Sequence, residues 1–211
     1  MDRYKYPRTP HLPFSLGATD DDKILKSTSH FNDKLVVITE KMDGENTSIY
    51  NDYYHARSID SKHKDYHSYL LANILPAVQY QIPDSYRICG EYLYAKHSIA
   101  YENLESYFLA FSIWNGNTCL RWSDFESLCE EWGLKTVPVL YKGVYNEDIV
   151  KKIANEVVAR GGEGIVVRLQ DAFEYEDFGN SIAKFVRPNH VQTDKHWTQS
   201  KIEANKLDKN W

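Results

Sequence analysis

Short apolar runs rich in β-branched and aromatic residues recur from Leu35 onward, separated by polar or glycine-containing breaks. Such runs favour β-strands, because branched and aromatic side chains pack well on a pleated surface. Asn115-Gly116 predicts a tight turn between two of these runs. The predicted strands are Leu35–Thr39, Ser48–Tyr50, Arg87–Tyr94, Tyr107–Trp114, Thr118–Leu120, Val137–Leu140, Gly164–Leu169 and Ile182–Val186.

Three segments between these strands carry helical signals, which predict helices over about 66–75, 123–133 and 146–160. The first has apolar residues at helical spacing and should stop near Pro76. The second opens with Ser123-Asp124-Phe125-Glu126, which has the form of a capping box. Asn146 can cap the third, and Gly161-Gly162 should end it. Helices interspersed among antiparallel strands predict an α+β fold.

The chain divides into three parts by composition. Residues 1–34 contain three prolines and an acidic run, which predict an irregular N-terminal arm. Residues 35–190 hold all the strand and helix signals and should form one domain. Residues 191–211 form a polar, lysine-containing tail that we expect to be helical beyond Thr193.

The composition is that of an ordinary globular protein, with 211 residues, 42% hydrophobic and 26% charged. A net charge of −5 argues against a strong non-specific grip on a polyanion, although it leaves room for a local basic groove. The three cysteines have no metal-binding spacing and predict reduced thiols. Neither a membrane-span-length apolar segment nor a signal-peptide pattern is evident, so we expect a cytoplasmic protein.

The tetrapeptide Lys41-Met42-Asp43-Gly44 directly follows a predicted buried strand. Lysine is almost never fully buried, but a lysine held at a strand end inside a pocket can lose its proton and act as a nucleophile. A solvated lysine in a hairpin turn explains the tetrapeptide equally well when it is taken alone.

Four further residues stand out along the strands. Glu91 lies inside an aromatic strand, Phe111 inside another, Glu163 between glycines, and Lys184 inside an apolar strand. Each has an ordinary explanation as an outward-facing acid, a core aromatic or a turn residue. Lys41 and Lys184 together suggest a shared anionic ligand, and a phosphate would accept charge-assisted hydrogen bonds from both.

In this order, the motifs resemble those of the covalent nucleotidyltransferases, which include ATP-dependent DNA and RNA ligases and mRNA capping enzymes. The resemblance extends from about Leu35 to Arg187. Glu40-Lys41 followed by Asn46 is similar to the Glu-Lys-x-x-Gly-x-Asn pattern of RNA ligases of the double-strand-sealing type. It implies a nucleotidyltransferase domain, an ATP-grasp-like ligase fold of antiparallel sheets flanked by helices.

The resemblance also implies a reaction. Lys41 would attack the α-phosphate of ATP and form lysyl-AMP, with Mg²⁺ or Mn²⁺ as the metal. AMP would then pass to an RNA 5′-phosphate, which a 3′-hydroxyl would join. Lys184 and the metal, both cationic, should favour loss of the Lys41 proton.

Each motif position takes a role from the resemblance. Lys41 and Lys184 are the implied catalytic residues. The implied nucleotide contacts are Glu40 and Asn46 beside the nucleotide, Arg57 downstream of the nucleophile, Glu91 on the ribose, Phe111 stacked on adenine, Glu163 with the metal, and Lys184 on the α-phosphate.

The sequence departs from the family pattern at two places, and several alternative functions stay open. Ile182 and Val186 flank Lys184 where the family often has Lys-x-Lys, and Ser112 follows Phe111 where Phe-Asp-Ile is common. A DNA ligase or a capping guanylyltransferase would use the same lysine chemistry. An alternative of another class is a non-catalytic nucleotide- or nick-binding module.

The expected partners are RNA ends or a nicked duplex. Ligases of this superfamily generally carry a second domain that grips nucleic acid, and the roughly 24 residues after Arg187 are too few for a small β-barrel. The alternatives are a minimal ligase, a partner protein or domain that supplies the grip, and phosphate contacts from basic residues of the arm and tail. Those residues are Arg3, Lys5, Arg8, Lys195, Lys201, Lys206 and Lys209.

Overall fold

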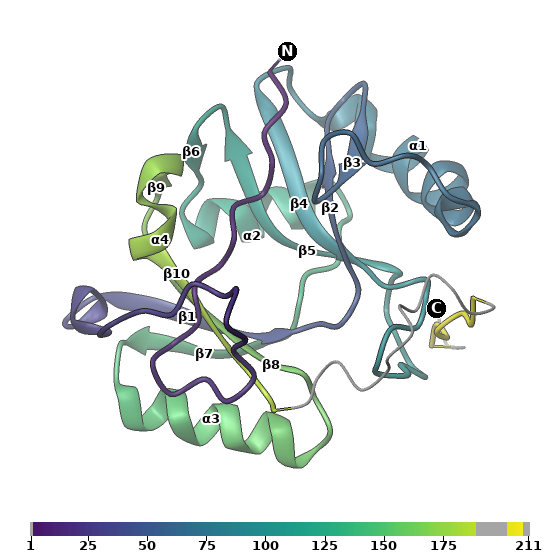
Figure 1. Cartoon of the computed structure of the whole chain (residues 1–211). Coiled ribbons are helices and arrows are strands. Elements are labelled where there is room, and N and C mark those ends of the chain that lie inside the picture. The colour runs from purple at the N-terminus through teal and green to yellow at the C-terminus, as the bar shows by residue number, and fades with distance from the viewer. Residues whose placement is uncertain (1, 189–201, 209–211) are drawn as a thin grey trace.

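A computed structural model describes residues 2–188 and 202–208. Two antiparallel sheets form the frame of the described chain (Figure 1). The smaller has the order β10-β8-β1-β7 and the larger β3-β2-β4-β5-β6-β9. The smaller consists of β1 (Leu35–Lys41), β7 (Val139–Val144), β8 (Gly164–Leu169) and β10 (Ile182–Val186). The larger consists of β2 (Glu45–Ile49), β3 (Tyr54–Ala56), β4 (Tyr86–Tyr92), β5 (Phe108–Asn115), β6 (Thr118–Cys119) and β9 (Phe173–Glu174).

The smaller sheet has a hydrophobic face and an opposite face that carries the predicted site residues Lys41 and Lys184, which we call the functional face. Strand side chains alternate between the two faces, and Val36, Ile38 and Ile165 pack in a core with α3 (Glu147–Ala159). That helix covers the outer side of the sheet (Figure 1). The alternate positions therefore point toward the larger sheet, and one row of Cα partners across them is Thr39, Val166 and Lys184.

The larger sheet has its own core. Ile88 and Ile113 from β4 and β5 are fully buried there with Phe125 of α2 (Trp122–Glu131). The short helices α1 (Leu75–Val78) and α4 (Phe178–Ser181) complete the fold. This core fixes β4 and β5, the strands that carry two of the predicted site residues.

The N-terminal arm docks on the free edge of β10. The arm has no regular element except one 3-10 turn at Ser29–Phe31, as the sequence predicts. Leu12 N donates to the Lys184 carbonyl at 2.7 Å, and Gly17 N donates to the Val186 carbonyl at 2.9 Å. Because Leu12 is fully buried, the arm is part of the domain and borders the functional face.

All predicted strands are present, with shifted ends at several of them. Asn146 caps α3 as predicted, since its side-chain oxygen accepts from Asp148 N and Ile149 N. The predicted capping box is wrong, because α2 begins at Trp122 and the side chain of its N-cap, Arg121, makes no capping hydrogen bond. Trp122 is 2% exposed, so tertiary packing rather than capping sets the start of this helix.

The segment predicted as one helix over 66–75 is helical throughout, but the type of helix changes along it. A 3-10 turn at Asp65–His67 and a π-helix at Leu70–Ile74 precede α1, and Pro76 lies inside α1 rather than ending a helix. Proline is tolerated in the first turn, where its missing N–H has no partner to lose. In the tail, residues 202–208 contain no helix, and the rest of the predicted helical tail lies outside the described residues.

Within the described ranges, no helix is both long and apolar enough to cross a membrane.

Candidate active site

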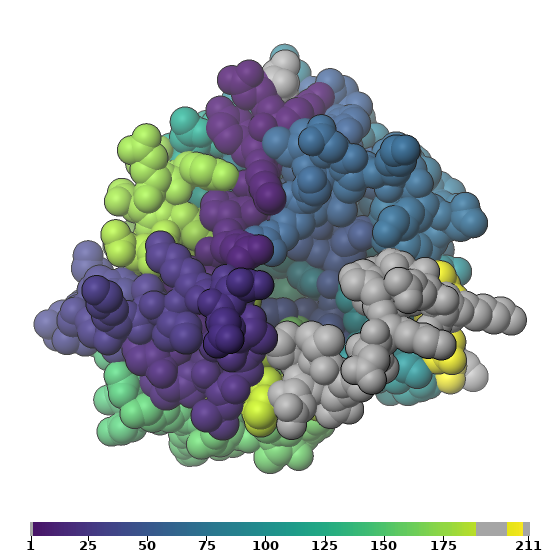
Figure 2. Space-filling view, in the orientation of Figure 1, coloured from purple at the N-terminus to yellow at the C-terminus, as the bar shows by residue number. Residues whose placement is uncertain are grey.

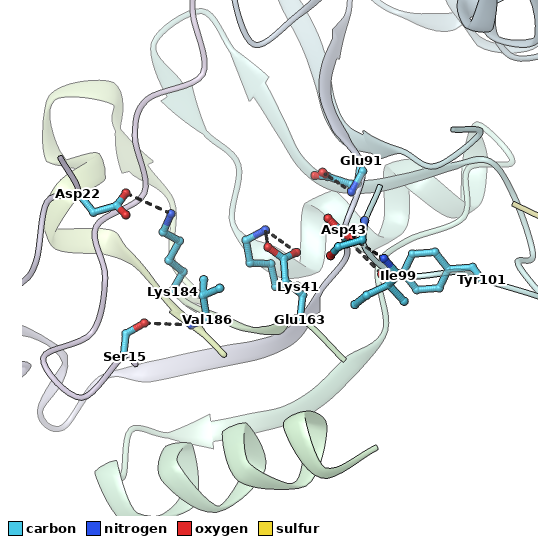
Figure 3. Close-up of polar contacts among 12 residues, drawn as sticks. Ser15, Asp22, Lys41, Asp43, Glu91, Ile99, Tyr101, Glu163, Lys184 and Val186 are labelled. Carbon is cyan, nitrogen blue, oxygen red and sulfur yellow. Dashed lines mark hydrogen bonds and ion pairs between the residues drawn. The ribbon is translucent and has the colours of Figure 1, made fainter. Parts of the chain in front are cut away.

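Lys41, the last residue of β1, forms an ion pair with Glu163 (Figure 3). Its Nζ lies 2.7 Å from both carboxylate oxygens. The Glu163 side chain is 6% exposed and that of Lys41 is 24% exposed. A buried carboxylate with both oxygens bonded to one ammonium fixes the position of the lysine, because breaking the pair would leave a buried charge unpaired.

Two glycines explain why Glu163 reaches Lys41. Gly161, after α3, has a φ of +88°, a conformation that favours glycine and turns the chain back toward the sheet. Gly164 is the Cα partner of Lys41, and a Cβ there would lie 1.9 Å from the Phe185 carbonyl oxygen. Only glycine allows β8 to begin so close to β10, and this start places Glu163 beside the end of β1.

The pair keeps Lys41 charged. Burial lowers the pKa of Lys41, but the carboxylates of Glu163 and Glu91 outweigh burial and raise it above the ordinary lysine value. The pKa of Lys184 is lowered, first by burial and then by the charge of Lys41. Lys184 and a metal were expected to favour loss of the Lys41 proton. Among the protein's own groups the carboxylates outweigh burial and raise the pKa of Lys41, and the effect of a metal stays a prediction.

A carboxyl group also supports the turn after Lys41. The Gly44 N–H donates to Glu91 Oε1 at 3.2 Å. Burial raises the pKa of Glu91 to about 8, although the charge of Lys41 opposes it. A pKa of about 8 keeps Glu91 largely protonated near neutral pH.

A second carboxylate holds the same turn from outside the pocket. Asp43 Oδ2 accepts from the N–H and hydroxyl of Ser98, both at 2.7 Å, and from the Ile99 N–H at 2.8 Å. The Asp43 N–H donates to the Tyr101 hydroxyl at 2.9 Å. The aspartate of the tetrapeptide therefore fastens the turn to the loop after β4.

A cavity of about 550 Å³ opens between the two sheets at this point. Figure 2 shows the hollow near the centre of its view, between the purple arm and the blue segments of the larger sheet. Glu163 is connected to the cavity through its ion pair with Lys41, which lines the cavity. The other predicted site residues all line the cavity, namely Glu40, Lys41, Asn46, Arg57, Glu91, Phe111 and Lys184.

Part of the cavity lining suits an aromatic base. Phe111 of β5 and Val166 of β8 belong to one hydrophobic cluster and both line the cavity. Three residues that line the cavity each have a buried polar atom with no hydrogen-bond partner among residues 2–188 and 202–208. These atoms are Asn46 Oδ1, Trp122 Nε1 and Arg168 Nη1. A nucleoside, which offers ring nitrogens and hydroxyls, would supply the partners these atoms lack.

Cations also line the cavity. Lys184 projects from the same sheet face as Lys41, and Asp22 of the arm lies 3.9 Å from its Nζ (Figure 3). Arg57, from the end of β3, and Arg8 of the arm also line the cavity. This grouping suits a phosphate chain, and sequence reasoning had placed Arg8 only among general nucleic-acid contacts.

Glu40, predicted to lie beside the nucleotide, lines the cavity, but its carboxylate has a protein partner that the sequence did not predict. Glu40 lies on β1 between Thr39 and Lys41, and its carboxylate is bound by the guanidinium of Arg160 at the end of α3. Sequence reasoning missed Arg160, because an arginine in the last turn of a helix is an ordinary surface residue. Arg3 and Lys206, proposed as phosphate contacts, instead pair with Asp52 and Glu102, and Lys195, Lys201 and Lys209 lie outside the described residues.

Glu163 was predicted to bind a metal. In the described part of the chain, no three His, Cys, Asp or Glu side chains are grouped to hold an ion. Mg²⁺ is commonly bound by one or two carboxylates together with substrate phosphates and water. The carboxylate of Glu163, bound to Lys41 beside a cavity that Lys184 and Arg57 also line, fits that pattern.

Comparisons with known proteins agree with this geometry. A sequence profile of the RNA ligase family matches residues 34–186. Comparison with curated protein sequences gives no significant match. The match to the profile covers more than half of the chain, so the chain belongs to the RNA ligase family.

Solved structures of ligases share the fold. An archaeal ATP-dependent RNA ligase has a TM-score of 0.62 at 17% identity, over 86% of this chain and 48% of that one. A putative ATP-dependent DNA ligase from Aquifex aeolicus has 0.59 at 19%, over 90% and 51%. A mutant Naegleria gruberi RNA ligase with ATP and Mn has 0.52 at 17%, over 75% and 51%. The chain spans about half the length of these ligases.

Replacement of Glu91 by glutamine tests the protonation of this side chain. A carboxyl whose pKa is higher in the folded chain than in the unfolded chain makes the free energy of unfolding fall as pH rises between the two values. Here the window runs from 4.5 to about 8. We expect a decline of up to about 1.4 kcal/mol per pH unit, and Glu91→Gln should flatten it in urea unfolding across that window.

The exposed Glu131→Gln variant is the control and should keep the slope of the original chain. An unchanged slope in Glu91→Gln would show that Glu91 is ionised throughout the window.

Proposed function

We propose that the chain carries the nucleotidyl-transfer centre of an ATP-dependent RNA ligase. The observation that supports this most directly is the position of Lys41. Lys41 ends β1 and lines a cavity whose lining also includes the aromatic ring of Phe111, buried donors without partners and the cation Lys184. A binding module would need the cavity and the cations but not a lysine fixed by a buried carboxylate.

In the proposed first step, the Lys41 amine attacks the α-phosphorus of ATP. A nitrogen–phosphorus bond forms, the bond to the β-phosphate oxygen breaks, and pyrophosphate leaves. Attack needs the neutral amine, whereas Glu163 holds the ammonium form in the ligand-free chain. Binding of ATP must therefore weaken the ion pair and give the lysine proton another acceptor before the bond can form.

Other residues of the cavity bind and orient the nucleotide. Phe111 stacks on the adenine, a contact worth about 1–3 kcal/mol. Lys184 holds the α-phosphate on the same sheet face as Lys41, so that a preorganised charge faces the negative charge that develops there. Glu91 in its protonated form can donate to a ribose hydroxyl while its other oxygen keeps the Gly44 bond.

Glu163 would hold a divalent cation, Mg²⁺ or Mn²⁺, which when bound neutralises phosphate charge. One solved relative was studied with ATP and Mn. An ion at Glu163 would compete with Lys41 for the same two oxygens.

The acceptor in this proposal is an RNA 5′-phosphate, which is then joined to a 3′-hydroxyl in RNA ends or a nicked duplex. The family match supports RNA, while a putative DNA ligase from Aquifex aeolicus has a similar fold. A partner protein or a further domain would supply the grip on nucleic acid. Three buried free cysteines suit a reducing compartment, and we place the reaction in cytoplasmic RNA repair.

Covalent labelling tests the first step. The chain incubated with α-labelled ATP and a divalent cation should become labelled, and Lys41→Ala should abolish the label because the attacking amine is gone. Lys142→Ala, an exposed ion-paired lysine of β7 in the same sheet, should label normally.

Each other result points elsewhere. Labelling that persists in Lys41→Ala would refute this nucleophile, labelling by GTP in place of ATP would favour a capping guanylyltransferase, and no labelling of the original chain would favour a binding module.

Nick sealing tests the acceptor. Nicked duplexes whose 3′-hydroxyl strand is RNA should be sealed in preference to all-DNA nicks. Sealing should weaken steeply as salt rises, since the chain has a net charge of −5 and binds phosphates through few cations. A preference for all-DNA nicks would instead support a DNA ligase.

A further inference from the structure

Residues 202–208 fold back onto the loop that holds the Lys41 turn. This segment lies beyond residue 186, where the match to the RNA ligase family ends. Ala204 and Leu207 form single β-bridges with Ala95 and Leu104. A stretch of chain outside the matched region thus contacts a loop directly linked to the nucleophile.

The loop over residues 94–107 has no regular secondary structure, and its backbone bonds go largely to this segment. The Lys96 N–H donates to the Glu203 carbonyl at 2.8 Å, and the Leu104 N–H donates to the Lys206 carbonyl at 3.0 Å. In return, the Lys206 N–H donates to the Tyr101 carbonyl at 2.9 Å. The segment therefore takes the place of a neighbouring strand for an otherwise irregular loop.

Asn205 is the centre of these contacts and is 3% exposed. Its side-chain Nδ2 donates to the Leu93 carbonyl at 2.7 Å, and its Oδ1 accepts from the Tyr101 N–H at 2.9 Å. Its own N–H donates to the Tyr94 carbonyl, and its carbonyl accepts from the Tyr107 hydroxyl. The amide of asparagine carries an acceptor and a donor on separate atoms of a short side chain, so both side-chain bonds form at once.

The contacts continue from Asn205 to the nucleophile. Tyr101, held by Asn205, accepts through its hydroxyl from the Asp43 N–H (Figure 3). Ser98 and Ile99 of the same loop bind the Asp43 carboxylate. Leu207 also packs in the cluster that contains Met42, the residue between Lys41 and Asp43.

We propose that residues 202–208 are a clip that positions the Lys41 turn, and that Asn205 is the positioning residue within it. The clip acts through the Tyr101 hydroxyl and Asp43, touches neither nucleotide nor phosphate, and rests on the proposed lysine chemistry for its effect on rate. It orders the loop, the loop orders the turn, and the turn sets the direction of the attacking amine.

The test uses the full chain with Asn205→Ala. The rate of Lys41 labelling at saturating ATP should fall at least about tenfold, because small displacements of a reacting group are costly. The KM for ATP should change much less than the rate, because His97 is the one residue of the loop over 94–107 that lines the cavity. Glu203→Ala, which removes only an exposed ion pair with Lys96, is the control and should label normally.

The route is tested by Tyr101→Phe, which removes only the hydroxyl that accepts from Asp43. If the clip acts through this hydroxyl, the double variant with Asn205→Ala should be little slower than the slower single variant. Effects that multiply, or an Asn205→Ala chain that labels at the original rate, would overturn the proposal.

Hydrogen exchange provides a readout independent of activity. In Asn205→Ala, the Ser98, Ile99 and Asp43 amides should exchange faster, while those of β8 stay protected. Unchanged exchange at these three amides would refute the clip. If the original chain forms no adduct with ATP, the proposed function fails, and the exchange measurement still decides whether the clip exists.

Discussion

The ion pair between Lys41 and Glu163 is the interaction around which the candidate site is arranged. It joins the end of β1 to the start of β8, where the two strands are neighbours and Gly164 allows close approach. It also keeps Lys41 in the charged form, which cannot act as a nucleophile. A lysine held this firmly is well aimed but charged, and only the neutral amine can attack. In the proposed reaction, substrate binding and activation of Lys41 are therefore coupled through the carboxylate of Glu163.

In the proposed function, the two sheets supply different parts of the substrate site. The smaller sheet supplies Lys41 and Lys184 on one face, because strand alternation sends the apolar residues to α3 and these lysines to the cavity. The larger sheet supplies Phe111 and Glu91 from strands that its own core makes rigid. Segments from both ends of the described chain close the frame, with the arm along β10 and residues 202–208 along the loop after β4.

The sequence predicted what local pattern can encode. Gly164–Leu169 and Ile182–Val186 match the structure residue for residue, since glycine or polar residues bound each apolar run. The predicted site residues come together because they lie on adjacent strands in a recognisable order. The start of α2 was misplaced, because burial of Trp122 outweighed a local capping pattern.

What the sequence did not predict depends on contacts between distant segments. Three features join residues about 100 or more positions apart: the docking of the arm, the pairing of Arg160 with Glu40 and the contacts of Asn205. No periodic pattern in the sequence encodes such contacts. The charge state of Lys41 belongs to this group too. Its neighbours Glu163 and Glu91 are far away in sequence, and their combined effect against burial depends on distances that only the fold sets.

The most direct test of the account is the pKa of Lys41, measured by NMR titration of its side chain in the ligand-free chain. The account predicts a value above the ordinary 10.5. It also predicts that Glu163→Gln lowers the value, because burial then acts on the ammonium with less opposition. A pKa below 10.5 in the original chain, or one that Glu163→Gln leaves unchanged, would contradict the claim that this ion pair holds and charges the nucleophile.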